Sequence, residues 1–396
     1  MTMKNISLFE ADRMTMNDSI ELTAASLNAY AEKYQHWAIA FSGGKDSSAT
    51  VTLVDWLIKT GKVAAPKTLT VLYADTRMEL PPLQISAMSI MENLEERGTK
   101  CSVILPKMDD RYMVYMLGRG VPPPSNTFRW CTSQIKIEPM QDALRQLRDE
   151  HGEKFLMLTG VRVGESAVRD QKIALSCSKN GAECGQGWFQ ETTPVQVADT
   201  LAPLLHWRVC HIWDWLMFDA PGLGYPTDMI AACYGGEEAQ EINARTGCVG
   251  CNLASRDTAL EQLLKLDAWK YLTPYTRLRP LYAQLKMAKN RLRKDGSDRR
   301  KDGALAANPM RLGPLTLEAR RYGLEQVINI QDEINAKAGT QQVELINPAE
   351  RQRIEELIYL ETWPRGWLGS EYSGDVMLPE VVGDGVVQNL LFGGER

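Results

Sequence analysis

The chain has 396 residues, which at about 150 residues per domain predicts two or three domains. Hydrophobic residues make up 44% of the chain and charged residues 24%, so collagen-like, mucin-like and wholly disordered chains are excluded. The formal net charge is −5, from 45 Lys and Arg against 50 Asp and Glu. Whole-chain electrostatics therefore give no argument for a nucleic-acid coat or a polybasic membrane protein, and any basic surface must be local.

No apolar run approaches the roughly 18 residues that a membrane-spanning helix needs. The first residues, MTMKNISLFEADR, have neither a signal-peptide core nor an Arg-rich amphipathic pattern, so we expect no membrane partner and a cytoplasmic location. The 8 cysteines are too sparse for a disulfide framework, and some stand at ligand-like spacings. Metal or redox chemistry is their favoured use.

Short apolar strands alternate with longer helices in the N-terminal half. The sequence predicts strands at 37–41, 68–74, 101–105 and 155–159, and helices at 45–59, 83–97 and 133–149. This alternation is typical of an α/β fold with a doubly wound parallel sheet covered by helices.

The organisation predicted along the chain has four parts. They are an N-terminal extension (1–30), a nucleotide-binding α/β domain (31–225) with an irregular stretch at 176–197, a cysteine-containing loop (226–258), and a mainly helical C-terminal region (259–396) with helices at 316–337 and 348–361. Within the last part we expect a flexible basic loop at 286–303. Eight cations there face three aspartates, a local net charge of 8 − 3 = +5: Lys286, Lys289, Arg291, Arg293, Lys294, Arg299, Arg300 and Lys301 against Asp295, Asp298 and Asp302.

The strongest local motif directly follows the first strand and opens a helix. It consists of Ser42, Gly43, Gly44, Lys45, Asp46 and Ser47. Two glycines let backbone N–H groups approach a phosphate, and the helix N-terminus and Lys45 favour its negative charge. The spacing differs from G-x-x-x-x-G-K-[ST] and from G-x-G-x-x-G, and a plain small-residue turn is the weaker alternative. Asp46 is predicted either to hold Mg²⁺ or to cap the helix.

This loop resembles the PP-loop of the ATP pyrophosphatase superfamily, which includes sulfonucleotide reductases and sulfurtransferases. The resemblance implies a HUP-like nucleotide domain that uses ATP with Mg²⁺. Asp75 stands at the end of the second strand, where a doubly wound sheet places ligand contacts. It could meet ribose or a metal, or cap a helix.

Two further motifs resemble the phosphoadenylylsulfate reductase-like branch of that superfamily. One is Arg129-Trp130-Cys131-Thr132 followed by Lys136, and the other is Gly160-Val161-Arg162 with Glu165 and Arg169. Arginines and a lysine that converge from strand ends suit an anionic phosphate or sulfate, although lone arginines are usually solvated. Glu165 is expected to orient Arg162 or Arg169 rather than to act as a base.

Four cysteines form the second constellation. Cys248 and Cys251 are spaced C-x-x-C, with Cys233 upstream and Cys131 in the RWCT motif. Four thiolates suit tetrahedral zinc or a [4Fe–4S] cluster. The resemblance favours the cluster over zinc, and both over free thiols, with Cys177 and Cys184 as rival ligands. Because Cys131 is two residues from Arg129, this centre is expected beside the nucleotide pocket.

No cysteine follows Cys251, which argues against a thioredoxin-linked sulfonucleotide reductase with a C-terminal nucleophile. The sequence from 30 to 360, with Gly313-Pro314-Leu315-Thr316-Leu317-Glu318-Ala319-Arg320 after a basic stretch, instead resembles the family of the Dnd-system C protein and its relative SspD, which act in DNA phosphorothioation. That resemblance implies ATP pyrophosphatase activity, an iron–sulfur cluster, and DNA as a partner. A separate cysteine desulfurase and other proteins of the phosphorothioation system are implied as further partners.

The resemblance predicts how the reaction runs. A DNA backbone oxygen would attack the α-phosphorus of ATP and expel diphosphate, with Lys45, Asp46, Arg162 and Arg169 as the catalytic residues. The alternatives are a sulfonucleotide reductase-like redox enzyme or another PP-loop sulfurtransferase, and a binding subunit without turnover. The basic stretch at 286–303 could bind DNA or a protein, but no aromatic residue is interleaved with its cations to stack on bases.

Overall fold

The computed structural model describes residues 14–164, 171, 182–183, 188–190, 197–234, 247–300, 302–339, 343–376, 380–382 and 386–388. The chain forms two compact units. Unit 1 comprises Met1–Asp75, Leu80–Ile104 and Glu138–Thr246, and unit 2 comprises Thr76–Glu79, Leu105–Ile137 and Gly247–Arg396. The units are therefore not consecutive along the chain, unlike the four successive parts expected from the sequence, because the segments that follow two strands of the sheet pack with the C-terminal region.

Unit 1 is built on a seven-stranded sheet in the order β3-β2-β1-β4-β7-β6-β5. Its strands are β1 (His36–Phe41), β2 (Thr68–Ala74), β3 (Lys100–Ile104), β4 (Phe155–Leu158), β5 (Ala182–Glu183), β6 (Trp188–Gln190) and β7 (Ala198–Ala202). The pairs β1–β2, β2–β3, β1–β4 and β4–β7 are parallel, and the β5–β6–β7 edge is antiparallel. The doubly wound α/β fold predicted from the sequence is confirmed.

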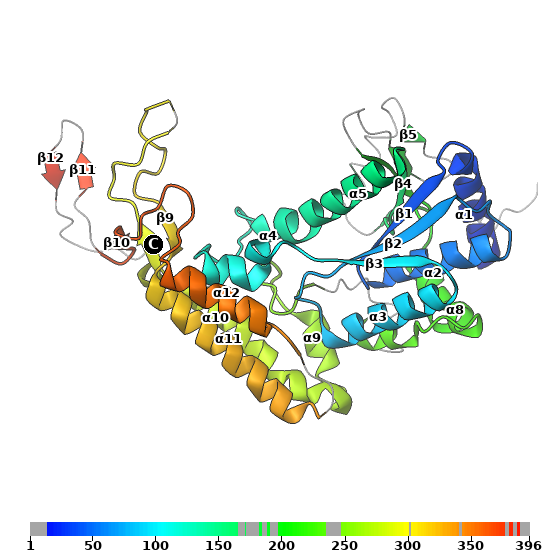
Figure 1. The fold of residues 1–396 in the computed structure, drawn as a ribbon. Coiled ribbons are helices and arrows are strands. Elements are labelled where there is room, and N and C mark those ends of the chain that lie inside the picture. The colour runs from blue at the N-terminus through cyan, green and yellow to red at the C-terminus, as the bar shows by residue number, and fades with distance from the viewer. Residues whose placement is uncertain are drawn as a thin grey trace, which may run out of the picture. The chain divides into compact units, whose positions relative to one another are not determined.

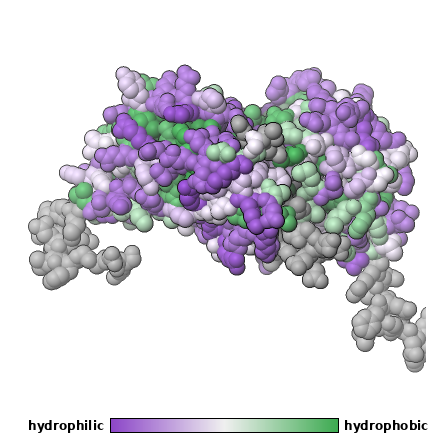
Figure 2. All heavy atoms as spheres, turned by 90° about the horizontal axis from the view of Figure 1, so that it is seen from below, coloured by the Kyte–Doolittle hydropathy of each residue, from purple (hydrophilic) through white to green (hydrophobic). Residues whose placement is uncertain are grey.

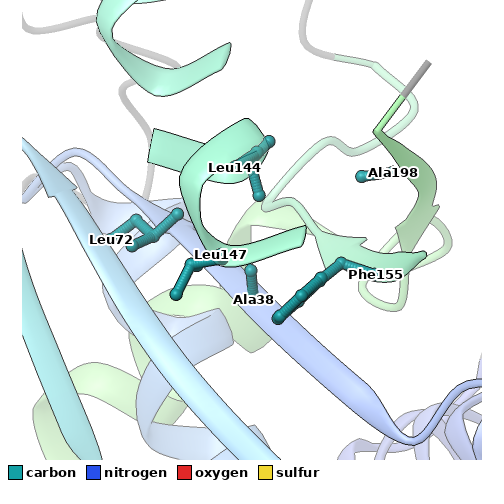
Figure 3. Close-up of a cluster of buried hydrophobic side chains, with 6 residues drawn as sticks. All are labelled: Ala38, Leu72, Leu144, Leu147, Phe155 and Ala198. Carbon is teal, nitrogen blue, oxygen red and sulfur yellow. The ribbon is translucent and has the colours of Figure 1, made fainter. Parts of the chain in front are cut away.

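The core of unit 1 explains why its strands read as continuous apolar runs. Helices cover both faces of the sheet, with α5 (Glu138–His151) on one face and α2 (Lys45–Lys59) and α3 (Pro81–Glu96) on the other (Figure 1). Side chains from α5 and four strands gather between helix and sheet (Figure 3): Ala38, Leu72, Leu144, Leu147, Phe155 and Ala198. Each large apolar side chain buried in this way contributes about 1.5–3 kcal/mol.

Several elements of unit 1 were not predicted, among them the parallel strand β7. Helix α1 (Met16–Ala31) lies in the expected N-terminal extension, and its buried face includes Ser19, Thr23 and Ser26, so it lacks an obvious apolar stripe. The hydroxyl of Thr23 accepts a hydrogen bond from Trp207 Nε1 at 2.9 Å, which ties this helix to unit 1. The stretch at 176–197 was expected to be irregular, but β5 and β6 lie within it. Strands of two and three residues are too short to show a period of two.

Unit 2 contains α4 (Trp130–Thr132), α9 (Thr258–Leu263), α10 (Leu278–Leu285), α11 (Leu317–Lys337) and α12 (Pro348–Tyr359). Helices α10, α11 and α12 pack side by side (Figure 1). A three-stranded sheet in the order β10-β8-β9 joins β10 (Tyr372–Ser373), β8 (Arg291–Arg293) and β9 (Leu312–Leu315). A separate hairpin pairs β11 (Glu380–Val382) with β12 (Val386–Gln388).

The expectation of a flexible basic loop at 286–303 is wrong for its first half. Arg291–Arg293 forms β8, with Leu292 buried between two arginines, and it pairs with both neighbouring strands. The alternation Arg-Leu-Arg fits a half-buried strand, but the surrounding charges obscured it. The side chain of Lys294 is also fixed, because its Nζ lies 2.7 Å from Glu371 Oε1.

Among the described residues no helix is both long and apolar enough to span a membrane. The face drawn in Figure 2 is mostly hydrophilic, with hydrophobic side chains dispersed among polar ones.

Candidate nucleotide site and cysteine set

The candidate nucleotide site lies where the strand order of unit 1 reverses. Strand β1 stands between β2 and β4: the chain adds β2 and β3 on one side of β1 and then returns from β3 to add β4 on its other side. In open α/β sheets, ligands bind outside the carboxyl ends of the strands at such a switch point. The loops that follow β1 and β4 begin at Ser42 and Thr159, and they carry the SGGKDS motif and Gly160.

The SGGKDS loop has the backbone conformation that its glycines were expected to provide. Gly43 has φ +72°, and a Cβ added there would lie 3.1 Å from Ala87 Cβ. Gly44 is the N-cap of α2 and has no side chain of its own to cap the helix start. The Ser47 hydroxyl donates to Gly44 O at 3.0 Å and accepts from the Ser42 N–H at 3.3 Å, which closes the loop on itself. An uncapped helix start behind a glycine turn is suited to an anion.

A chain of ion pairs links this loop to the segment after β4. Lys45 is only 3% exposed, and its Nζ lies 3.1 Å from Asp46 Oδ2. Arg162 Nε donates to the other oxygen, Asp46 Oδ1, at 2.5 Å, and Arg162 Nη1 donates to Trp207 O at 3.1 Å. Asp46 therefore bridges two cations and does not cap the helix. Two cations, Lys45 and Arg162, thus share the carboxylate of Asp46 at the strand ends.

Gly160 is required by close backbone packing. A Cβ added at Gly160 would lie 2.8 Å from the carbonyl carbon of Asp46 and 2.9 Å from Ser47 N, and both of these are main-chain atoms. Only glycine allows the loop after β4 to pack this closely on the SGGKDS loop, and this contact brings Arg162 to Asp46.

Tyr234 is a site residue that the sequence did not reveal. Its hydroxyl accepts the Lys45 backbone N–H at 3.3 Å, and its ring centroid lies 5.2 Å from Lys45 Nζ. Trp213 packs edge-on against the same ring, with the centroids 5.1 Å apart. Tyr234 ends the 3₁₀ segment Asp228–Tyr234, which carries no motif, so no sequence signal pointed to it.

The remaining predicted site residues are not all brought to this loop. Asp75 is 6% exposed at the end of β2, and its N–H donates to Ile104 O at 3.0 Å. Arg129 and Lys136 belong to unit 2, where Arg129 Nη2 donates to Asn126 Oδ1 at 3.0 Å. Glu165 and Arg169 lie outside the described residues.

Unit 2 holds three of the four predicted cysteine ligands, which we call the three-cysteine set: Cys131, Cys248 and Cys251. Cys131 is in α4, and the other two flank a turn in which the Cys251 N–H donates to Cys248 O at 3.0 Å. The Val249 N–H donates to Met78 O at 2.6 Å, which anchors that turn. All three cysteines are half-buried.

The electrostatics of these groups are coupled. Burial raises the pKa of Cys248 to about 11, while the ammonium of Lys136 pulls in the opposite direction. Burial and the nearby Cys251 raise the pKa of Cys131. The pKa of Lys136 is raised, chiefly by Cys248, with Glu79 acting in the same direction. These mutual effects indicate that the three thiols, one cation and one carboxylate share a small region of unit 2.

The thiols of the three-cysteine set are suitable metal ligands, but their side chains are not grouped around one ion position. Thiolates are the ligands that zinc and iron–sulfur clusters prefer. Yet no three or more His, Cys, Asp or Glu side chains of the described residues gather closely enough to hold a metal ion. The side chain of Cys233 and the whole of Cys177 and Cys184 lie outside the described residues. The cluster therefore remains a prediction.

Residues 36–220 match the family model of the phosphoadenosine phosphosulfate reductase domain. Over this range, slightly less than half of its length, the chain is similar to that domain.

Two curated relatives come from Methanocaldococcus jannaschii. The uncharacterized protein MJ0066 is 25% identical over 191 residues, 48% of this chain and 33% of the relative. The uncharacterized protein MJ0973 is 24% identical over 186 residues, 46% of this chain and 37% of the relative. The chain thus spans about a third of the length of these relatives.

Solved structures with some likeness include three enzymes. A phosphoadenylyl-sulfate reductase of Candida auris has a TM-score of 0.32 at 13% identity, covering 54% of this chain and 93% of that one. The U34-tRNA thiolase NcsA of Methanococcus maripaludis, with its [4Fe-4S] cluster, has a TM-score of 0.34 at 14% identity, covering 68% and 79%. An FMN adenylyltransferase of Candida glabrata has a TM-score of 0.33 at 15% identity, covering 56% and 59%. At these scores the likenesses carry no argument about function.

Proposed function

We propose that unit 1 binds ATP at the SGGKDS loop and transfers its adenylyl group with release of diphosphate, which activates an acceptor for sulfur incorporation. The observation that carries this proposal is the bridge Lys45–Asp46–Arg162 beside an uncapped helix start, at the switch point of the sheet. A buried lysine and arginine there are suited to the negative charge that develops on transferred phosphoryl groups. The phosphoadenosine phosphosulfate reductase-like domain at 36–220 supports a nucleotide ligand.

In this proposal the chain's residues have distinct roles. Lys45 and Arg162 bind phosphate oxygens. The phosphates, which arrive with Mg²⁺, are cradled by those N–H groups of the SGGKDS loop that do not donate to Ser47 or Tyr234. Asp46 is a positioning residue, because it holds both cations in place. Asp75, directly after β2, would contact the nucleoside or its metal. Arg169 would help to stabilise the developing charge, and Glu165 would orient Arg162 or Arg169. No general base is needed when the attacking oxygen is already anionic.

The finer assignment is DNA phosphorothioation. Here the acceptor is a backbone phosphate of DNA, and a cysteine desulfurase supplies the sulfur. The three-cysteine set with Cys233 would hold a [4Fe–4S] cluster, with zinc as the alternative, and such a cluster would supply sulfur-carrying or redox chemistry. The support for this assignment is the sequence resemblance described above, and its place of action would be the cytoplasm.

The decisive experiment measures diphosphate released from ATP by anaerobically purified full-length protein, with and without DNA. Lys45→Ala is expected to lower the rate at least about 100-fold, as loss of a group that stabilises transition-state charge does. Lys59→Ala, at the exposed C-terminal end of the same helix, is the matched control and should leave the rate unchanged. Unchanged release in the Lys45 variant would remove the role proposed for the loop.

A second candidate is a sulfonucleotide reductase-like activity, which the family of the 36–220 domain favours. It predicts sulfite release from phosphoadenylylsulfate in the presence of an external thiol, without cleavage of ATP. Sulfite without diphosphate would select this candidate over the pyrophosphatase.

A further inference from the structure

Unit 2 contains a basic cavity whose lining includes no residue assigned above to the ATP site or to the three-cysteine set. Its volume is about 420 Å³, and its walls come from the segment before α4, from β8 and β9, and from the chain after α12. Three cations line it, Lys286, Arg291 and Arg311, and no Asp or Glu occurs among the described residues of its lining. A concave site with several cations and no carboxylate attracts an anion.

The charges of this cavity are only partly neutralised. Arg291 donates to Gly313 O at 2.8 Å and to Leu312 O at 3.1 Å, which fixes its guanidinium in the wall without pairing its charge. Arg311 Nε lies 2.6 Å from Asp298 Oδ2, and within the described part of the chain it is the one of the three cations with a carboxylate partner. Burial and the neighbouring charge of Arg291 lower the pKa of Lys286. A bound anion would relieve this repulsion between Lys286 and Arg291.

Aromatic side chains complete the cavity, and they come from distant parts of the chain. Phe128 and Tyr115 precede α4, whereas Trp367 follows α12. Phe128 is 50% exposed, which is unusual for a phenylalanine beside cations and leaves a ring face open to stack on a ligand. Trp367 is buried and lies under Arg311, with 5.1 Å from the guanidinium carbon to the ring centroid. The basic stretch at 286–303 contains no aromatic residue, but the fold places three aromatic rings in the same cavity lining as its cations.

We propose that this cavity is a nucleoside phosphate site, in which Lys286, Arg291 and Arg311 hold the phosphate and Phe128 stacks on the base. Its volume falls within the range of about 300–1,000 Å³ of small-ligand sites, which suits one nucleotide unit. A base inside a duplex cannot stack on Phe128, so the ligand is a free nucleotide or a nucleotide of an unpaired strand. The proposal goes beyond the ATP chemistry of unit 1 and does not depend on it, because every lining residue belongs to unit 2.

The test measures binding of AMP and of a short unpaired oligodeoxynucleotide of mixed sequence to the full chain over a series of salt concentrations. Phe128→Ala is expected to weaken binding about tenfold, the effect of losing one base–aromatic stack. Lys286→Gln is expected to lower the slope of log K against log salt by about one. The matched controls Lys289→Gln and Phe218→Ala, an exposed lysine and an exposed phenylalanine outside the cavity, should behave as the unchanged protein.

The two ligands distinguish the sources of the nucleotide. Weakened AMP binding in the cavity variants assigns a free nucleotide, and weakened oligonucleotide binding assigns an unpaired strand; both support the proposal. The proposal is overturned if the cavity variants and the unchanged protein have equal affinity for both ligands. It is also overturned if an oligodeoxynucleotide duplex binds as tightly as the single strand and its affinity is unchanged by Phe128→Ala.

A second substitution at Phe128 keeps the test valid if the alanine variant does not fold. Phe128→Leu keeps an apolar side chain without a ring, so it is expected to weaken stacking even if the alanine variant unfolds. Diphosphate release from ATP alone should be unchanged in every cavity variant. A failure of the ATP proposal would therefore appear in the unchanged protein as well, and would be distinguishable from a failure of the cavity.

Discussion

Arg162 Nε donates a hydrogen bond to Asp46 Oδ1 over 2.5 Å, although 116 residues separate the two in sequence. The contact is possible because Gly160 lets the loop after β4 pack directly on the SGGKDS loop. It joins two motifs that follow different strands into one charged site.

Gly160→Ala is expected to lower the rate of diphosphate release from ATP at least about tenfold, because the new methyl group would push the backbone at Asp46 and Ser47 out of place. Gly222→Ala is the matched control, since a Cβ there meets nothing within 4 Å. Steady-state assays of both variants test the packing argument. Equal rates would mean that the two loops do not act as a unit.

Arg162→Lys is expected to lower kcat at least about tenfold while the charge is kept. Lysine has no planar fork, so it cannot bond both Asp46 Oδ1 and Trp207 O as arginine does. Arg145→Lys, on the exposed face of α5, should have no effect. A variant that raises KM and leaves kcat intact would instead indicate uniform binding of ATP without a role in the transition state.

Cys251→Ser is expected to lower the iron and acid-labile sulfide content of anaerobically purified protein to a small fraction of the original. Cys101→Ser is the control, because Cys101 is a thiol of β3 in unit 1 whose pKa burial raises to about 12, a setting for an inert structural cysteine. Metal analysis together with absorbance spectra measures the effect. Stoichiometric zinc in the unchanged protein would replace the cluster assignment.

Arg320→Lys is expected to destabilise the protein by about 2 kcal/mol through lost hydrogen bonds to buried carbonyls. Arg320 is fully buried, and its guanidinium donates to Leu117 O, Gly118 O and Thr362 O. The exposed neighbour Arg321, changed to Lys, should leave stability unchanged. Chemical denaturation followed by circular dichroism gives both values, and equal midpoints would contradict the structural role.

Acid is expected to destabilise unit 1 through His36. Burial and the charge of His151 lower the pKa of His36 in the folded state, against a smaller opposite effect of Glu153. The unfolded chain therefore takes up this proton at a higher pH, and stability falls as the pH drops through the ordinary range of histidine. In His36→Phe, which keeps a ring stacked near His151, the melting temperature should depend less on pH between neutral and mildly acidic buffer. An identical pH dependence would exclude His36 as the source.

The motif Gly313–Arg320 makes one contact that is local in the chain and one that depends on the tertiary structure. The resemblance that it carries concerns a family, whereas its side chains have structural roles in unit 2. Gly313 lies against the Trp367 ring with no room for a Cβ, and the Thr316 hydroxyl caps α11 by accepting the Ala319 N–H at 3.2 Å. The contact between Gly313 and Trp367 cannot be inferred from residue order, because Trp367 is distant in the chain, whereas the Thr316 cap is local.

The sequence by itself determined the parallel sheet, the helix that follows β1 and the glycine-rich loop between them. These features follow from local periodicity and from backbone conformations that only certain residues adopt, so they can be recognised within a few neighbouring residues. Short strands such as β6, and α1 with its buried serines, escaped because their local patterns are weak.

Only the tertiary structure decided which side chains meet. The bridge between Asp46 and Arg162, the Tyr234 hydroxyl on the loop, and the aromatic rings beside Lys286 and Arg291 all join residues far apart in the chain. Such contacts depend on strand order and on the packing of loops at the sheet edge, where a single missing Cβ, as at Gly160, sets the distance. Residue order does not encode that geometry locally, because it arises only when the whole sheet is assembled.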